Sequence, residues 1–250
     1  MDFELMGKNY IITGASSGIG RAACIELSKQ KANVILVARN EERLQETLDQ
    51  MEQGNHTLIS CDLTSLDEIS GVVTDIYEKY NVIDGIIYSA GITKTPKLSK
   101  ATYEEMNPTM LINYYAFIEL LRHAVDKKKK HPMSVVAISS MSVLTCNAGS
   151  IAYSASKAAL EAAVRVFSKE LFKKNVRINA IRPAEVDTEM TTYGWGMIYD
   201  DYGKHLKETG FQPYGLIDPA DVANMAIYLT KDAAKAITGM MIPINGGARF

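Results

Sequence analysis

The stretch Thr13-Gly14-Ala15-Ser16-Ser17-Gly18-Ile19-Gly20 decides how this chain of 250 residues folds, because it lies between two different patterns. A run typical of a β-strand, Asn9 to Thr13, leads into it, and a helical pattern begins directly after it. Gly14 permits a tight turn, Gly18 lets a pyrophosphate approach the backbone, and Gly20 lets the helix pack close to the sheet. At the positive end of that helix, the residues predicted to bind the phosphates of a dinucleotide are Gly14, Ser16, Ser17, Gly18, Ile19 and Gly20.

The spacing of the three glycines narrows the class of nucleotide. It is Gly-x₃-Gly-x-Gly, which differs from the Gly-x-Gly-x₂-Gly of other dinucleotide folds. The stretch also lacks the Gly-Lys-Ser/Thr ending of an ATP-binding P-loop. The pattern therefore disfavours ATP chemistry.

Short β-rich runs alternate with longer amphipathic runs along the chain, as in repeated βαβ units. Strands are expected at 9–13, 33–38, 57–60, 83–89, 134–139, 176–181 and 240–244. Helices are expected at about 18–31, 41–53, 66–80, 102–129, 152–173 and 219–230. The pattern predicts an α/β fold, with residues 1–250 forming a single domain around a doubly wound (Rossmann) sheet of seven mainly parallel strands with helices on both faces.

The bulk properties exclude several kinds of partner. The formal charge at pH 7 is −2, so no basic surface for nucleic acid is expected, and no apolar stretch approaches the roughly 20 residues of a membrane span. The start of the chain resembles no secretory signal, which favours the cytoplasm. Cys24, Cys61 and Cys146 are widely spaced, with no CxxC pair and no histidine nearby, which indicates reduced thiols and no metal site.

One segment, residues 188–216, breaks the alternation of strands and helices. Its periodicity is weak, and among its glycines it carries the large residues Met190, Tyr193, Trp195, Met197, Tyr199, Tyr202 and Phe211. Long irregular insertions in compact domains are often lids or binding loops, so a substrate lid is expected here. The alternative is an oligomer contact or ordinary packing.

The end of the second predicted strand indicates which dinucleotide binds. Sites that prefer NAD usually place a carboxylate there, which accepts hydrogen bonds from the ribose 2′-hydroxyl group. Here the sequence is Val37-Ala38-Arg39-Asn40, and the guanidinium of Arg39 could instead pair with a 2′-phosphate. We therefore expect NADP(H) to be preferred over NAD(H). Alternatively, Asn40 caps the next helix and Arg39 is only a surface residue.

The segment Tyr153-Ser154-Ala155-Ser156-Lys157 opens a helix and carries a candidate acid/base pair. A spacing of four residues puts the phenol of Tyr153 and the ammonium of Lys157 on one helix face. The cation would favour phenolate and bring the pKa of the tyrosine, ordinarily about 10, towards neutral pH. This motif alone is common in helices. Ser140 makes it more specific, because it ends a predicted strand at the edge where open α/β sheets bind ligands.

Together these motifs resemble those of the short-chain dehydrogenase/reductase family, in family order over nearly the whole chain. The matching features are Thr13-Gly14-x₃-Gly18-x-Gly20, Asp62-Leu63, Ala90-Gly91, Asn113, Ser140, Tyr153-x₃-Lys157, Pro183-x₄-Thr188 and Gly246-Gly247. The resemblance implies an oxidoreductase that transfers a hydride between nicotinamide and a carbonyl or secondary alcohol. It also implies a homotetramer or homodimer.

The resemblance further implies roles for individual residues. Tyr153 would exchange a proton with the substrate oxygen, and Ser140 would hold that oxygen. Lys157 would bond the nicotinamide ribose and stabilise phenolate, while Asn113 would position water that links the lysine to solvent. The other cofactor contacts would be Asp62 and Leu63 at the adenine, Ala90 and Gly91 in the cleft, and Pro183, Val186 and Thr188 at the nicotinamide.

Some of these positions have structural alternatives. Asp62 could cap a helix near Ser65, Asn113 could be a buried polar group, and Pro183 could simply end a strand. The chain also departs from the family pattern twice, with Tyr88-Ser89-Ala90-Gly91 in place of Asn-Asn-Ala-Gly and Pro183-Ala184 in place of Pro-Gly. We expect both departures to alter the fine geometry of the site rather than the reaction class.

The sequence leaves the substrate open. The lid favours an apolar or ring-shaped molecule, and by the resemblance Leu144 and Cys146 would help to shape its pocket. One candidate is a 3-oxoacyl-carrier-protein, for which Arg122, His123 and Lys127 to Lys130 offer positive charge. Others are a sugar, steroid or secondary-metabolite ketone. A non-catalytic NADP-binding regulatory subunit is the remaining alternative, although all four catalytic positions are intact.

Overall fold

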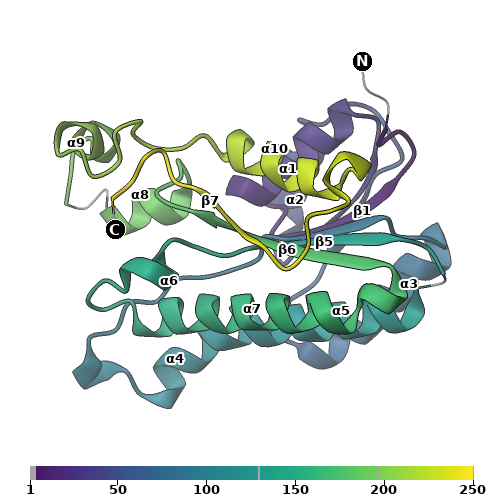
Figure 1. The fold of residues 1–250 in the computed structure, drawn as a ribbon, viewed down its shortest axis with the longest axis horizontal. Helices are drawn as coiled ribbons and strands as arrows, with labels where there is room; N and C mark the ends of the chain where they lie inside the picture. The colour runs from purple at the N-terminus through teal and green to yellow at the C-terminus, as the bar shows by residue number, and fades with distance from the viewer. Residues whose placement is uncertain (1–3, 129, 196–197, 250) are drawn as a thin grey trace.

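The centre of the protein is a parallel β-sheet. In the computed structural model, which describes residues 4–128, 130–195 and 198–249, seven strands pair in the order β3-β2-β1-β4-β5-β6-β7 (Figure 1). Their bounds are β1 Asn9–Thr13, β2 Asn33–Ala38, β3 Thr57–Ser60, β4 Gly85–Tyr88, β5 Met133–Ile138, β6 Val176–Pro183 and β7 Met241–Ile244. The predicted doubly wound sheet is confirmed. Lys129, Met197 and Phe250, which entered the sequence interpretation, lie outside the described residues.

The strand bounds show how far sequence patterns locate the ends. The first three strands lie where the sequence predicts them, but β4 is shorter than the predicted 83–89, and β5 and β7 are each displaced by a single residue at one or both ends. β6 continues to Pro183, beyond its predicted end at Ile181, because Arg182 and Pro183 pair with Pro243 and Ile244 of β7. That pairing joins segments about sixty residues apart, so no local pattern predicts it.

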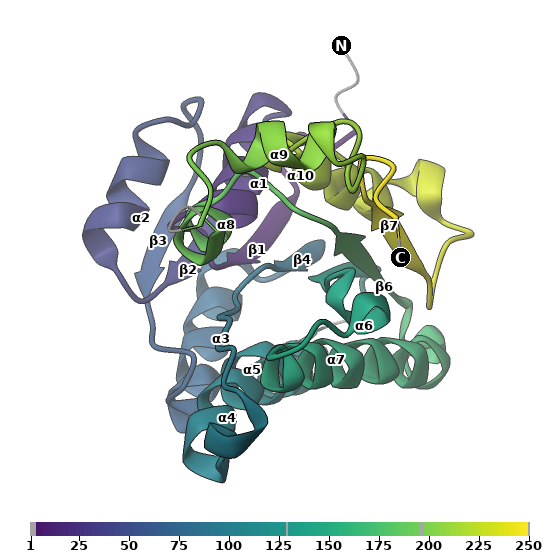
Figure 2. The ribbon, with the colours of Figure 1, turned by 90° about the vertical axis from the view of Figure 1, so that its left-hand side faces the viewer.

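Helices cover both faces of the sheet in two layers (Figures 1 and 2). One layer contains α1 Gly18–Lys29, α2 Glu41–Leu48 and α10 Pro219–Thr230, and the other contains α3 Leu66–Tyr80, α5 Ala116–Lys127 and α7 Ile151–Glu170. Successive strand residues pack against different helical layers. Ile12 belongs to the apolar cluster beneath the first layer, and Ile11 belongs to the cluster beneath the second. Because both faces are buried, the strands are apolar throughout instead of alternating with polar residues.

The helix predicted at 102–129 runs without a gap from Tyr103 to Lys127, but it contains a π-helical turn. It consists of α4 (Tyr103–Met110), a π-helical turn η2 (Leu111–Tyr115) and α5. Asn113 lies in the π turn, where its side chain bonds to the backbone of Ile92, a residue of the loop after β4. The helical period of the sequence does not predict this turn, because the contact joins two distant segments. π turns are rare in proteins overall, but many of those that occur are at functional sites.

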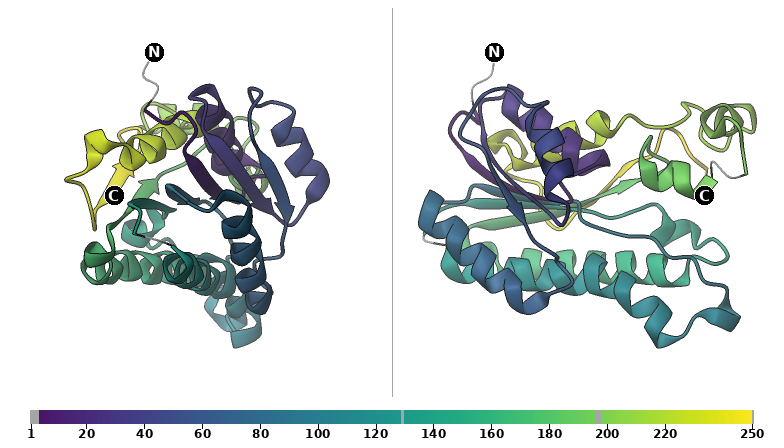
Figure 3. Two further views of the ribbon diagram at one scale, coloured as in Figure 1. Left: turned by 90° about the vertical axis from the view of Figure 1, so that its right-hand side faces the viewer. Right: turned by 180° about the vertical axis from the view of Figure 1, so that it is seen from behind.

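The segment at 188–216 is also more regular than expected. It contains two short helices, α8 (Glu189–Trp195) and α9 (Tyr202–Glu208), and Asp201 caps α9 by accepting a hydrogen bond from the backbone N–H of Lys204 at 2.8 Å. Figure 2 shows α8 and α9 at the end of the sheet where α6 (Ser142–Thr145) follows β5. In the right-hand view of Figure 3 the C-terminus lies beside this segment, and the backbone N–H of Arg249 donates to the carbonyl of Phe211.

None of the helices within residues 4–128, 130–195 and 198–249 is long and apolar enough to cross a membrane.

Candidate active site

The predicted site residues meet at the carboxyl edge of the sheet, where β1 and β4 lie side by side. The helices that follow these two strands pack on opposite faces, which opens a crevice at the strand ends. Thr13, at the end of β1, joins the two walls: its buried hydroxyl accepts hydrogen bonds from the backbone N–H groups of Ser89 and Ala90, each at 3.1 Å. The sequence motif contains Thr13, but only the structure shows this contact.

The glycines of the turn after β1 are required by close backbone approaches. A Cβ on Gly14, which has φ of +66°, would lie 2.9 Å from the backbone nitrogen of Ala90, and a Cβ on Gly20 would lie 2.2 Å from the carbonyl oxygen of Gly14. Gly18 has φ of +49° and faces Thr188, whose Cγ2 would be 3.1 Å from such a Cβ. The turn therefore presents bare backbone to the crevice. The unpaired N–H groups in the first turn of α1 fit the phosphates of a dinucleotide.

Ser16, Ser17 and Ile19 are partly exposed beside this backbone. Ser17 has an extended conformation and directly precedes α1. The carbonyl oxygen of Ser16 accepts a hydrogen bond from Arg21 Nη2 at 2.7 Å, which fixes the turn against the helix.

Arg39 follows β2 at the same edge of the sheet. Its side chain is 78% exposed, and Nη1 lies 4.0 Å from Oδ2 of Asp62. Asp62 accepts hydrogen bonds from Thr64, which, together with the nearby Arg39, hold its pKa below the usual value. The side chain of Asp62 therefore does not cap the helix that follows Ser65. Asn40 does cap α2, by accepting a hydrogen bond from the N–H of Arg43, but this leaves the guanidinium of Arg39 at the mouth of the crevice.

Tyr153 and Ser140 come together from different elements. Tyr153 lies in the first turn of α7, Ser140 follows β5, and the Ser140 side chain is near enough to the phenol to influence its pKa. Burial raises the pKa of Tyr153, the hydrogen bond with Ser140 lowers it, and the nearby carboxylate of Glu185 raises it. The net shift is upward, so the expectation that Lys157 lowers this pKa is wrong for the structure. The phenol is protonated at neutral pH and can donate a proton.

Lys157 does not bond the phenol directly in this arrangement. Its Nζ lies 5.8 Å from the centroid of the Tyr153 ring and donates to the carbonyl oxygen of Ile138 at 2.7 Å. Burial lowers the pKa of Lys157 to about 8. The ammonium is therefore still mostly charged at pH 7.

Asn113 is fully buried behind the lysine. Its Oδ1 accepts from the N–H of Ile92 at 2.9 Å, and its Nδ2 donates to the carbonyl of Ile92 at 3.0 Å and to Oγ of Ser156 at 2.9 Å. A Cβ on Gly91 would lie 3.1 Å from Asn113 Oδ1 and 3.4 Å from Lys157 Nζ. Gly91 thus lets these two side chains approach each other, and Asn113 is both a satisfied buried polar group and a neighbour of the lysine.

The segment after β6 forms the other wall of the crevice. Pro183 is the last residue of β6, which agrees with the alternative that this proline ends a strand. Val186 pairs with Ile217 in an isolated parallel bridge. Thr188 reaches Gly18 of the glycine-rich turn. The methyl group of Ala184, one of the two departures from the family pattern, packs against the apolar cluster of the α1 layer.

Gln212 fixes this wall and has no signal in the sequence. The side chain is fully buried; its Oε1 accepts from the N–H of Glu185 at 3.0 Å, and its Nε2 donates to the carbonyl of Glu185 at 2.9 Å. The same nitrogen donates to the carbonyl of Gly215 at 2.5 Å. A residue late in the predicted lid therefore holds the backbone of Glu185, whose carboxylate is near Tyr153.

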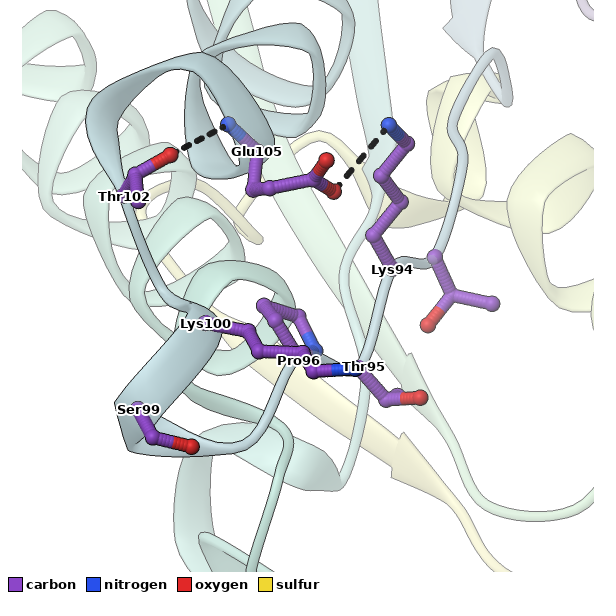
Figure 4. A pocket seen from close by; sticks show the side chains of 8 residues that line it. Lys94, Thr95, Pro96, Ser99, Lys100, Thr102 and Glu105 are labelled. Carbon is purple, nitrogen blue, oxygen red and sulfur yellow. Dashed lines mark hydrogen bonds and ion pairs between the residues drawn. The ribbon is translucent and has the colours of Figure 1, made fainter.

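A cavity of about 720 Å³ opens in the loop between β4 and α4 (Figure 4), and its lining consists of Thr93, Lys94, Thr95, Pro96, Ser99, Lys100, Thr102 and Glu105. Nearly all of these side chains are polar, and Lys94 Nζ lies 3.7 Å from the carboxylate of Glu105. A Cβ on Gly149 would lie 3.6 Å from the carbonyl oxygen of Thr95, so this loop contacts the loop that joins Ser140 to Tyr153.

The sequence matches a family model described as Enoyl-(Acyl carrier protein) reductase, over residues 14–249. A 3-oxoacyl-[acyl-carrier-protein] reductase FabG from Rickettsia felis is 32% identical over 250 residues, covering 98% of each chain. Carbonyl reductase family member 4 from Danio rerio is 29% identical, covering 98% of this chain and 99% of the relative. An L-xylulose reductase from Caenorhabditis elegans is also 29% identical and covers 98% of this chain and 97% of its own length.

Solved structures agree with these relatives. A short-chain dehydrogenase/reductase from Brucella melitensis, described as a glucose/ribitol dehydrogenase, superposes with a TM-score of 0.90 at 26% identity over the whole of both chains. A dehydrogenase/reductase from Sinorhizobium meliloti superposes with a TM-score of 0.89 at 27% identity, covering 99% of this chain and 97% of the other. The likeness thus extends over the sheet and both helical layers.

Proposed function

Because the chain belongs to the short-chain dehydrogenase/reductase family, whose members oxidise alcohols and reduce carbonyl groups, we propose that it reduces a small-molecule ketone with NADPH, or oxidises the corresponding alcohol with NADP. The observation that carries the proposal is the convergence of Ser140, Tyr153, Lys157 and Asn113 beside a glycine-rich turn that fits a dinucleotide. A regulatory subunit without turnover would not need these side chains together.

In the proposed reaction each of the four converging side chains has a separate role in proton transfer. Bound nicotinamide supplies or accepts the hydride. Ser140 donates a hydrogen bond to the substrate oxygen, and Tyr153, protonated at neutral pH, gives that oxygen its proton during reduction. The ammonium of Lys157, with its pKa of about 8, stabilises the phenolate that remains. Asn113 keeps the backbone of Ile92 and the hydroxyl of Ser156 in place behind the lysine.

The preference for NADP(H) is proposed on the charge at the end of β2. Arg39 lies there in place of the carboxylate that would accept bonds from a ribose 2′-hydroxyl group, and its guanidinium is mostly exposed at the crevice. Asp62, about 4 Å away, keeps the guanidinium oriented without burying it. A 2′-phosphate can pair with this guanidinium through two parallel hydrogen bonds.

For the substrate we propose a ketone with an apolar part and a polar part, of which a 3-oxoacyl thioester on a carrier is the first candidate. Leu144 and Cys146 are exposed on the loop between Ser140 and Tyr153, and the rings of Tyr199 and His205 stack with their centroids 4.1 Å apart in the predicted lid; both offer apolar surface. The loop cavity supplies lysine and hydroxyl groups. The names of the relatives point to 3-oxoacyl, carbonyl and xylulose substrates, so a sugar ketone is the second candidate.

The test has two stages. Nicotinamide fluorescence first measures the dissociation constants of NADPH and NADH for the wild type and for Arg39→Ala; a preference for NADPH that is lost in the variant is expected. NADPH oxidation is then followed with a 3-oxoacyl thioester, a simple diketone and a ketose. Activity that survives in Tyr153→Phe would refute the acid/base assignment, and failure to bind either nucleotide would favour the regulatory alternative.

A cytoplasmic homo-oligomer is proposed as the working form. Tyr115 and Val166, next to α5 and on α7, are large apolar residues that are 46% and 49% exposed, and these two helices lie together on one face of the sheet. Light scattering after gel filtration tests the assembly, because a monomer mass near 27.5 kDa would contradict it.

A further inference from the structure

A buried ion pair lies next to the candidate active site. Glu161, one turn after Lys157 on α7, is 1% exposed. Its Oε1 accepts from Arg182 Nε at 2.6 Å and its Oε2 accepts from Arg182 Nη2 at 2.5 Å, which is a bidentate pair between α7 and β6. Such a pair is weak evidence for a role in stability, because desolvation of two charges offsets much of their attraction. Its second contact is more informative.

Glu161 also accepts a hydrogen bond from the hydroxyl of Ser139, at 2.8 Å. Ser139 is 2% exposed and directly precedes Ser140. One turn earlier on the same helix, Lys157 donates to the carbonyl of Ile138. The helix that carries Tyr153 is therefore bonded to two consecutive residues at the end of β5, immediately before the serine that meets the tyrosine.

We propose that Glu161, held by Arg182, is a positioning residue that acts through Ser139 to set Ser140 against Tyr153. The inference rests on the proposed function, since it assumes that these two hydroxyl groups hold the same substrate oxygen. Ser140 and Tyr153 belong to different elements, so their separation depends on how firmly the end of β5 is tied to α7. Arg182 fixes the orientation of the Glu161 carboxylate, because it donates two parallel hydrogen bonds to it. The oxygen that accepts from Ser139 is therefore held in one place.

Two double variants separate positioning from charge burial. Glu161→Gln with Arg182→Met removes both charges but keeps a carbonyl oxygen for Ser139. Glu161→Leu with Arg182→Met removes both charges and the acceptor. We expect kcat within about threefold of the wild type for the first and a loss of about tenfold to hundredfold for the second, because small misplacements of reacting groups are costly. NADPH affinity should be the same in both.

The controls address folding and the surface charge nearby. Urea unfolding must show that both double variants are folded; if the leucine variant is not, Ser139→Ala, which removes only the donor, takes its place with the same expected loss. Arg165→Ala removes a half-exposed cation whose Nη2 is 3.5 Å from Glu161 Oε2, and it should leave kcat unchanged. Equal kcat in the two double variants, or full activity in Ser139→Ala, would overturn the proposal.

The same variants distinguish this inference from the proposed function. If the wild type reduces no carbonyl compound, the proposed function fails, and the positioning proposal is decided by crystal structures of the two double variants. The separation of Ser140 Oγ from Tyr153 Oη should match the wild type in the glutamine variant and be longer in the leucine variant. Equal separations would overturn the proposal.

Discussion

Replacing Lys157 by Met should abolish turnover and at the same time change how stability depends on pH. Lys157 is 4% exposed, and burial lowers its pKa from 10.5 to about 8. A methionine has a similar length and no charge, so it fits the same space without the desolvation cost. It lacks the ammonium that the proposed mechanism requires for the phenolate of Tyr153.

The magnitude follows from proton linkage. Between pH 8 and pH 10.5 the unfolded chain binds more protons at Lys157 than the folded protein does, so the stability of the wild type rises with pH in this window. The difference in pKa corresponds to a cost of about 3 kcal/mol at pH 7 and about 1 kcal/mol at pH 10. The loss of the hydrogen bond to Ile138 in the variant offsets about 1 to 3 kcal/mol of the gain.

The assay is urea unfolding of the wild type and Lys157→Met at pH 7 and pH 10. The difference in the free energy of unfolding between the two proteins should move by about 2 kcal/mol in favour of the wild type as the pH rises. Other titrating groups cancel in this difference. Lys169→Met, at an exposed position on the same helix, should change stability by less than about 0.5 kcal/mol at either pH. If the difference in the free energy of unfolding between the wild type and Lys157→Met does not change with pH, the inference that burial lowers the pKa of Lys157 is wrong.

Three further variants test the proposed site. Tyr153→Phe should lower kcat at least about a thousandfold while the dissociation constant of NADPH, measured by fluorescence, changes less than about twofold, because the ring stays and only the transferred proton is lost; equal losses in both would indicate a binding role. Arg39→Ala should weaken NADPH binding about tenfold or more and leave NADH binding unchanged, since a charge-assisted pair contributes about 1.5 to 3 kcal/mol; an equal loss for both nucleotides would point to a structural role. Thr13→Val should destabilise the fold by about 2 kcal/mol in urea unfolding, because the N–H groups of Ser89 and Ala90 lose their acceptor; unchanged stability would show that water replaces the hydroxyl.

The sequence predicts the elements of the site better than its detailed chemistry. Gly14 and Gly20 lie at close backbone approaches in the turn after β1, Gly18 has a positive φ there, and the first three strands have the predicted bounds. These features depend on local backbone geometry, which residue type controls directly. The pKa of Tyr153 moves opposite to expectation, because burial outweighs the hydrogen bond from Ser140, and Lys157 is bonded to Ile138 instead.

Gln212 and Glu161 show what a single sequence does not reveal. The sequence places Gln212 in a predicted lid and Glu161 on an amphipathic helix. Both side chains are nevertheless buried beside the crevice, where Gln212 bonds to backbone and Glu161 bonds to side chains. The partners that connect them to other elements, Glu185 for Gln212 and Ser139 and Arg182 for Glu161, lie more than twenty residues away along the chain. No local period or spacing encodes such a contact.

The sequence by itself determined the alternation of strands and helices, the glycine-rich turn and the order of the motifs, because these follow from side-chain periodicity and from the backbone freedom of glycine. The tertiary structure alone decided that Asn113 lies in a π turn, that Thr13 joins β1 to β4, and that Glu161 ties α7 to the end of β5. Hydrogen bonds between distant segments depend on which strands become neighbours in the sheet. That order is a property of the packed fold.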